Sequence, residues 1–182
     1  MQRIPNVERA TLGPDGQAAY DRIAASRGSV RGPFGVLLHH PLLGERVGEV
    51  GELLRFHGVL PGADRELAIL TTARELRAAV EWVGHAPLAL KEGASPEAIE
   101  VVRQGLPADD LNPREALVIN AVRALFTDHT LSDALYEAVD ATFGQQGLIE
   151  LTVLAGYYGL LGFVLNTLQV DVPAGNERLF EV

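Results

Sequence analysis

The sequence predicts an all-α protein, and three features carry this prediction. Apolar residues recur at helical spacing, as at Leu43, Val47, Val50 and Leu54, which follow one another at intervals of four, three and four. Segments of this kind are separated by Pro, Gly and helix-capping residues. No stretch of useful length alternates between apolar and polar residues as a half-buried β-strand does.

The N-terminal part of the chain is expected to contain an arm and two helices. Residues 1–13 are predicted to be extended, and a helix of about ten residues should follow and end near Gly28. Residues 28–35 should form a loop. A second helix is expected over residues 41–57, and Gly58 should end it.

Capping residues divide much of the remaining chain into helices. Ser95 is expected to begin a short helix, and Asn112 another that runs to about residue 128. Thr130 or Ser132 should begin a further helix, which Gly144 is expected to end.

Residues 151–170 contain no charged side chain, and as a helix they would be long enough to span a bilayer. They include several glycines and polar residues, however, and their flanks are Glu150 and Asp171, with no Lys or Arg nearby. We therefore reject the membrane interpretation. A helix that is apolar all round is expected to be buried in the domain core or against a neighbouring subunit.

The composition limits the number of domains and the kinds of partner. With 182 residues, the chain is expected to form a single domain over residues 1–182. Hydrophobic residues make up 47% of it and charged residues 21%, as in ordinary globular proteins. The net charge of −9 and the lack of basic runs argue against binding to nucleic acid or to an anionic membrane surface.

The chain has no cysteine, which excludes disulfides, thiolate metal sites and thiol redox chemistry. The N-terminal residues lack the apolar core of a secretory signal. We therefore expect a cytoplasmic protein.

The chemistry is expected in the stretch from Asp64 to Gly93, which opens with Asp64 as an acidic cap. If this stretch is helical, Glu81 and His85 are neighbours, because residues four apart share a helix face. A carboxylate beside an imidazole can orient the ring and make it a proton-transfer group near neutral pH. The alternative is an ordinary exposed Glu–His pair, but the adjacent Trp82 and small apolar residues favour partial burial.

Three short motifs in and after this stretch carry a family resemblance. Residues 65–70 read RELAIL, Glu81 and Trp82 precede His85, and residues 95–99 read SPEAI. Together they resemble the carboxymuconolactone decarboxylase family, within the superfamily that includes the alkylhydroperoxidase-D-like (AhpD-like) proteins. The best-matching core spans residues 64–100, and the resemblance implies an AhpD-like helical bundle. Similarity between residues 65–70 and 114–119 hints at two related helical half-units.

The resemblance also implies which residues act. Redox members of the superfamily carry Cys-x-x-Cys-x-x-x-His, and alignment on His85 places Ala78 and Glu81 at the two cysteine positions. Without thiolates, a peroxidase mechanism is excluded. The superfamily's Glu nineteen residues before the His corresponds to Glu66. Glu66, Glu81 and His85 are therefore expected to be catalytic in a cofactor-free reaction, in which a carboxylate leaves and the resulting enolate is reprotonated.

Four further residues are candidates for contacting the substrate. Arg65 and Arg74 could hold an anionic group through bidentate hydrogen bonds, although each could equally lie on a solvated helix face. His39 matches the family's apolar-His-x-Pro pattern at a helix entrance. Trp82 could line the pocket, although a single Trp beside an apolar helix more often packs in the core. No metal is expected, because neither His-x-x-x-His nor Glu-x-x-His spacing occurs.

Two functions are open at this point. The first is a cofactor-independent lyase or isomerase that acts on a small acidic or lactone-like molecule. The second is a non-catalytic, oligomeric member of the same family that binds a small molecule. A buried His85 that contacts both Glu66 and Glu81 and faces a cavity would favour the first.

We also expect a homo-oligomer, either a trimer or a hexamer. Residues 151–170 are apolar around the whole helix, and large exposed apolar patches usually mark interfaces. The family resemblance implies the same, through ring-like assemblies. Further apolar side chains that need cover are Leu42, Leu43, Leu53, Leu54 and Phe56.

Overall fold

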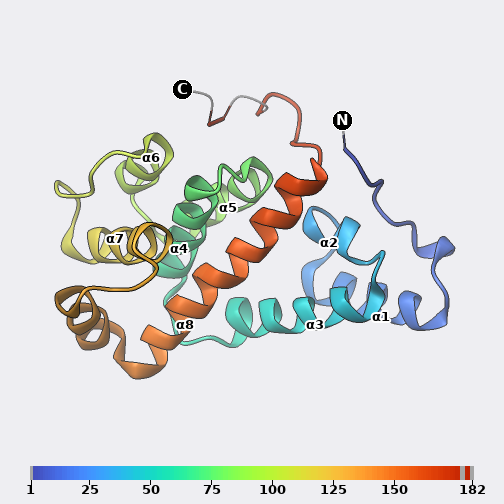
Figure 1. The fold of residues 1–182 in the computed structure, drawn as a ribbon, viewed down its shortest axis with the longest axis horizontal. Coiled ribbons are helices and arrows are strands. Elements are labelled where there is room, and N and C mark those ends of the chain that lie inside the picture. Colours follow the sequence, from blue (N-terminus) through green and yellow to red (C-terminus); the bar gives the residue numbers. More distant parts are fainter. Residues whose placement is uncertain (1, 177–178, 181–182) are drawn as a thin grey trace.

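A computed structural model describes residues 2–176 and 179–180 of the chain, and all regular elements in these residues are helices. The longest helix, α8 (Asp133–Leu168), runs diagonally through the molecule, with α1 to α3 on one side and α4 to α7 on the other (Figure 1). The all-α prediction is confirmed.

The elements follow one another in a simple order. They are the 3-10 turn η1 (Arg9–Thr11), α1 (Pro14–Arg27), α2 (Pro33–Leu37), α3 (Pro41–Glu52), the π-helical turn η2 (Leu53–His57), α4 (Gly62–Glu75), α5 (Ala79–Glu92), α6 (Pro96–Gln104), α7 (Pro113–Thr127) and α8.

The predicted loop over residues 28–35 is wrong at its C-terminal end, where α2 begins. Pro33 occupies the first turn of this helix, where its missing N–H costs nothing, and all five residues of α2 are buried. A helix of barely more than one turn has no periodicity to detect, so burial of Phe34 and Leu37 fixes it instead. The helix expected over residues 41–57 is present, with a π-helical last turn.

The break expected at Gly144 is present as a kink within one long helical element. Ser132 caps α8 by accepting a hydrogen bond from the backbone of Leu135. Gly144 then adopts φ 68° and ψ 174°, a conformation that is essentially restricted to glycine. After the kink the helix is long and apolar enough to cross a membrane by length and composition, but 56% of its most apolar window is buried inside the protein. This burial is what a core helix requires.

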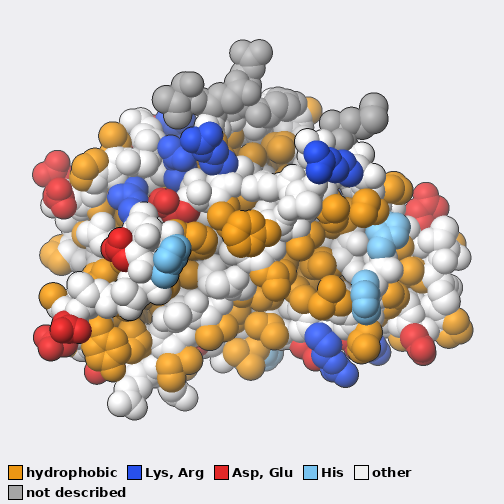
Figure 2. All heavy atoms as spheres, in the orientation of Figure 1, with side chains coloured by type: hydrophobic (Ala, Val, Ile, Leu, Met, Phe, Trp, Pro, Cys, Tyr) orange, Lys and Arg blue, Asp and Glu red, His pale blue; other side chains and the backbone are white. Residues whose placement is uncertain are grey.

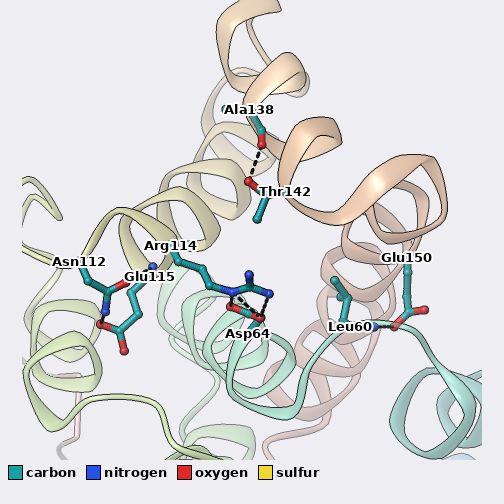
Figure 3. A network of polar contacts seen from close by, with 8 residues as sticks. All are labelled: Leu60, Asp64, Asn112, Arg114, Glu115, Ala138, Thr142 and Glu150. Atoms are coloured by element: carbon teal, nitrogen blue, oxygen red, sulfur yellow. Dashed lines mark hydrogen bonds and ion pairs between the residues drawn. The ribbon is translucent and has the colours of Figure 1, made fainter.

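Polar contacts fix the second half of the fold (Figure 3). Asp64 on α4 faces Arg114 on α7, and an Arg114 Nη2–Asp64 Oδ2 distance of 2.8 Å closes the ion pair. Glu150 of α8 accepts hydrogen bonds from the backbone of Val59 and Leu60, just before α4. The interpretation of Asp64 as a cap is wrong, because α4 already begins at Gly62 and the Asp64 carboxylate is buried against Arg114.

The central pair α4 and α5 is a helical hairpin that places the site. Its turn is tight, since Arg77 adopts a positive φ of 52° and α5 begins two residues later. Every residue of α4 from Glu66 to Ala73 is buried, so this helix forms the centre of the core. A buried carboxylate on α4 must therefore find its partner on a neighbouring helix.

Candidate active site

The hairpin brings the three expected catalytic residues together. Nδ1 of His85 lies 2.6 Å from Oε2 of Glu66, and Nε2 of the same ring lies 3.5 Å from Oε2 of Glu81. All three side chains are buried. The imidazole therefore stands between two carboxyl groups, with one on each of its nitrogens.

The pKa values of the two carboxyl groups are shifted in opposite directions. Burial raises the pKa of Glu66, but the hydrogen bond and charge of His85 and two nearby arginines outweigh it, so that the pKa lies below its ordinary value. At Glu81, burial raises the pKa and the nearby positive charges only partly oppose it. Two titratable groups with pKa values pushed apart are a common arrangement for acid–base chemistry.

The ionised state of Glu66 determines which imidazole nitrogen carries a proton toward it. An ionised Glu66 carboxylate can only accept a hydrogen bond, so Nδ1 of His85 donates to it. Nε2 faces the carboxyl group of Glu81. Glu66 orients the ring and stabilises its positive form, while Glu81 can exchange a proton with it.

Tyrosines from α8 form the wall beside the imidazole. The ring of Tyr158 meets His85 edge-on at a centroid distance of 5.1 Å, and Tyr157 packs edge-on against Tyr158. Burial raises the pKa of Tyr157 to about 12 and that of Tyr158 well above its ordinary value. Both phenols therefore keep their protons at neutral pH.

A cavity of about 660 Å³ opens beside Glu81 and His85. Its apolar walls include Phe34, Leu88 and Leu161, and part of its rim comes from the two ends of the chain. The N-terminal arm is fastened to the end of α8, where the backbone N–H of Arg3 donates to the carbonyl of Leu168. The arm and the segment after α8 accordingly lie at the same end of the molecule (Figure 1).

Positive charge lines the same cavity. Arg27 from the end of α1, Arg31, and Arg55 from η2 all contribute to its wall. A π-helical turn interrupts a helix and often occurs at functional sites, and here it carries Arg55. The cavity thus combines the imidazole of His85 with three arginines, the carboxyl groups of Glu81 and Asp171, and apolar walls.

The four residues predicted to contact substrate do not line this cavity. Nε of Arg65 lies 3.3 Å from Oε1 of Glu66 and pairs with that carboxylate. Arg74 donates to the backbone of Arg103, and His39 contacts the carbonyl of Pro5. Trp82 is buried against Phe180, in agreement with its alternative interpretation as a packing residue.

The residues that line the cavity were missed for physical reasons. Arg27 and Arg55 lie far from His85 in the sequence, and only the tertiary fold brings them together. One signal was available for Arg55, since it is a lone charge within the apolar run Leu53–Phe56. Another was available for Tyr158, because polar aromatic rings in an otherwise uncharged buried helix need a partner.

The geometry of the three catalytic candidates does not suit a metal. Glu66 and Glu81 engage opposite nitrogens of the imidazole, so the three groups do not converge on a common point. Within the part of the chain that the structure describes, no group of three or more His, Asp or Glu side chains could hold a metal ion.

Fold and site together define a class of protein, an all-helical protein in which a buried imidazole stands between two carboxyl groups beside a cavity lined in part by arginines. The sequence profile of the Carboxymuconolactone decarboxylase family matches residues 41–124, so this segment is similar to that family. The matched segment includes α3 to α6 and contains Glu66, Glu81 and His85. The resemblance seen in the sequence is thus confirmed.

A solved structure establishes the fold over nearly the whole chain. It is described as the alkylhydroperoxidase AhpD core of an uncharacterized peroxidase-related protein from Ralstonia eutropha JMP134. It matches with a TM-score of 0.78 and 20% identity, covering 98% of this chain and 94% of that chain. The expected AhpD-like helical bundle is confirmed, and at this identity the likeness concerns the fold alone. A comparison with curated proteins found no match.

Proposed function

We propose that this protein is a cofactor-independent acid–base enzyme of the carboxymuconolactone decarboxylase type. It acts as a decarboxylase, another lyase or an isomerase on a small acidic or lactone-like molecule. The observation that carries the proposal is the buried His85, which contacts Glu66 and Glu81 on opposite nitrogens and faces a cavity. A binding protein without catalysis has no need for two buried carboxyl groups, with pKa values shifted in opposite directions, around an imidazole.

The geometry supports a defined division of labour. In a decarboxylation, the bond between the substrate and its leaving carboxylate breaks, carbon dioxide departs, and the electron pair stays on the substrate as an enolate. The Nε2–H of the His85 imidazolium then donates its proton to that carbon. Glu66 stabilises the imidazolium through Nδ1. Glu81 returns a proton to Nε2 afterwards and regains its own proton from water, so that each turnover consumes one solvent proton.

Replacement of His85 tests the proposal directly. We expect His85→Ala to keep the helical circular dichroism spectrum and to lose turnover on a panel of small carboxylates and lactones by about 10²-fold or more. Glu66→Gln should lose less, because the imidazole remains but its charged form is no longer stabilised. A His85→Ala variant that turns over such a substrate at the wild-type rate would place the reaction elsewhere.

We further propose that the protein lacks thiol peroxidase activity. The chain contains no cysteine, and Ala78 and Glu81 stand where the redox members carry the pair. We expect no hydroperoxide reduction with any dithiol donor, measured as peroxide loss against a buffer blank. Peroxide turnover that rises linearly with enzyme concentration would contradict this.

A further inference from the structure

Three arginines line the cavity, Arg27, Arg31 and Arg55, and two of them, Arg27 and Arg55, place positive charge close to the buried Glu81. Arg27 and Arg55 come from α1 and η2, which lie outside the α4–α5 hairpin that carries the relay. Neither forms an ion pair with any residue that the structure describes, whereas Arg9, Arg114 and several others do. Glu81 neutralises neither of them fully, because its own burial favours the uncharged carboxyl group.

The guanidinium of Arg27 is held in place before any ligand binds. It stacks over the ring of Phe34, 4.4 Å from the centroid, and Nη2 donates to the carbonyl of Gly48 at 3.2 Å. A Cβ atom at Gly51 would lie 2.5 Å from this Nη2 and 2.1 Å from the hydroxyl of Tyr157. The glycine therefore leaves the space in which both groups sit.

Two buried polar atoms in this region have no hydrogen-bond partner within the described chain, Nε of Arg27 and Oε1 of Glu81. The hydroxyl of Tyr157 lies beside the guanidinium of Arg27. Proteins rarely leave buried donors and acceptors unpaired unless a ligand or water completes them. The unpaired Nε–H of Arg27 is a hydrogen-bond donor that a bound anion would satisfy.

We propose that Arg27 and Arg55 bind a carboxylate of the substrate and so hold its reacting carbon against Nε2 of His85. This inference rests on the proposed function and names the substrate class, a small carboxylate with an apolar body. The guanidinium groups supply charge-assisted hydrogen bonds to the carboxylate oxygens. The apolar body fits against Leu88, Leu161 and the neighbouring apolar wall.

The test measures binding separately from turnover. Benzoate, adipate and a butyrolactone carboxylate, each beside its methyl ester, are titrated into the full-length protein by calorimetry and protein-observed NMR. We expect at least one acid to bind and its neutral ester to bind about tenfold or more weakly, since the arginines recognise charge. Equal binding of acid and ester, or no binding of any acid at millimolar concentration, would overturn the proposal.

Variants then assign the contact to the two arginines. Arg27→Gln and Arg55→Gln should each weaken carboxylate binding by about 10- to 100-fold, and Arg55→Lys by less, because it keeps the charge but not the planar fork. Arg46→Gln serves as the matched control, since Arg46 is exposed on α3 and pairs with Glu49 outside the cavity. If Arg55→Gln binds the acid as tightly as wild type does, the inference is overturned. This outcome can be read even if Arg27→Gln fails to fold.

The two proposals fail in different ways. His85→Ala should keep carboxylate binding within about threefold, because the arginines remain, while it loses turnover. Wild-type turnover in His85→Ala would refute the acid–base function and leave the arginine contact standing. Full carboxylate affinity in the arginine variants would refute the contact and leave the relay standing.

Discussion

At the scale of single residues, the site contains two buried carboxyl groups whose pKa values are shifted in opposite directions. Glu66 and Glu81 are both buried, yet only Glu66 has a short hydrogen bond to the imidazole, at 2.6 Å against 3.5 Å for Glu81. The hydrogen bond and nearby charges keep Glu66 ionised, whereas desolvation dominates at Glu81 and favours its neutral form. In the proposed mechanism, the same residue type therefore orients the ring on one side of His85 and supplies a proton on the other.

This asymmetry predicts how stability depends on pH. The folded-state pKa of Glu81 is raised above the ordinary value of 4.5, so the unfolded chain releases this proton first as the pH rises. Glu81 therefore lowers the free energy of unfolding progressively from about pH 4.5 up to its folded-state pKa. Glu81→Gln mimics the neutral carboxyl group and removes this penalty.

We expect the free energy of unfolding of Glu81→Gln, minus that of wild type, to increase with pH across this window. Urea unfolding at a series of pH values measures it, and the neighbouring charges of His85, Arg55 and Arg27 are common to both proteins. A difference that stays constant with pH would show that Glu81 is ionised in the folded protein.

At the scale of elements, the hairpin of α4 and α5 could be predicted from the sequence, and the opposite wall of the cavity could not. Glu66 and His85 are nineteen residues apart and lie on the two helices of one hairpin. Their proximity could therefore be predicted from the family motif. Arg27 and Arg55 come from α1, which packs against α3, and from η2, which continues α3, and no short-range pattern encodes how these elements meet the hairpin. Arg65 and Arg74 lie near Glu66 and His85 in the sequence, which made them candidates. Neither side chain lines the cavity.

The kink in α8 gives a prediction at the same scale. Gly144 has φ 68° and ψ 174°, where an L-residue is strained even though nothing lies within 4 Å of its missing side chain. We expect Gly144→Ala to lower the free energy of unfolding by about 1–3 kcal/mol, measured by urea denaturation.

Gly156 is the matched control for this substitution. It lies in the straight part of α8, is exposed, has no neighbour within 4 Å of an added Cβ, and is not among the glycines with positive φ. Gly156→Ala should therefore raise the free energy of unfolding by about 0.5–1 kcal/mol through helix propensity. Equal effects of the two substitutions would show that the Gly144 conformation carries no strain.

At the scale of the whole molecule, α8 has a buried side and an exposed apolar side, which no other residue that the structure describes covers. Hydrophobic side chains gather over the middle of the face where α8 and α3 lie (Figure 2). Ile149, Val153, Leu160 and Phe163 recur along one side of α8, and Phe163 is 61% exposed. Leu42, Leu43, Leu53 and Phe56 are exposed on α3 and η2, whereas Leu54, for which cover was also expected, is already buried in the core of the single chain.

We propose that copies of the same chain cover this surface in a trimer or hexamer. Leaving several large side chains in water forgoes about 25 cal/mol for each Å² of apolar surface that an interface would bury. Patches of this kind are rare on monomers. Size-exclusion chromatography with light scattering should give a mass of three or six chains at micromolar concentration. Phe163→Asp should shift that mass toward 19.5 kDa, whereas Leu106→Asp, at an exposed site between α6 and α7, should not. A wild-type mass near 19.5 kDa would show a monomer and refute the proposal.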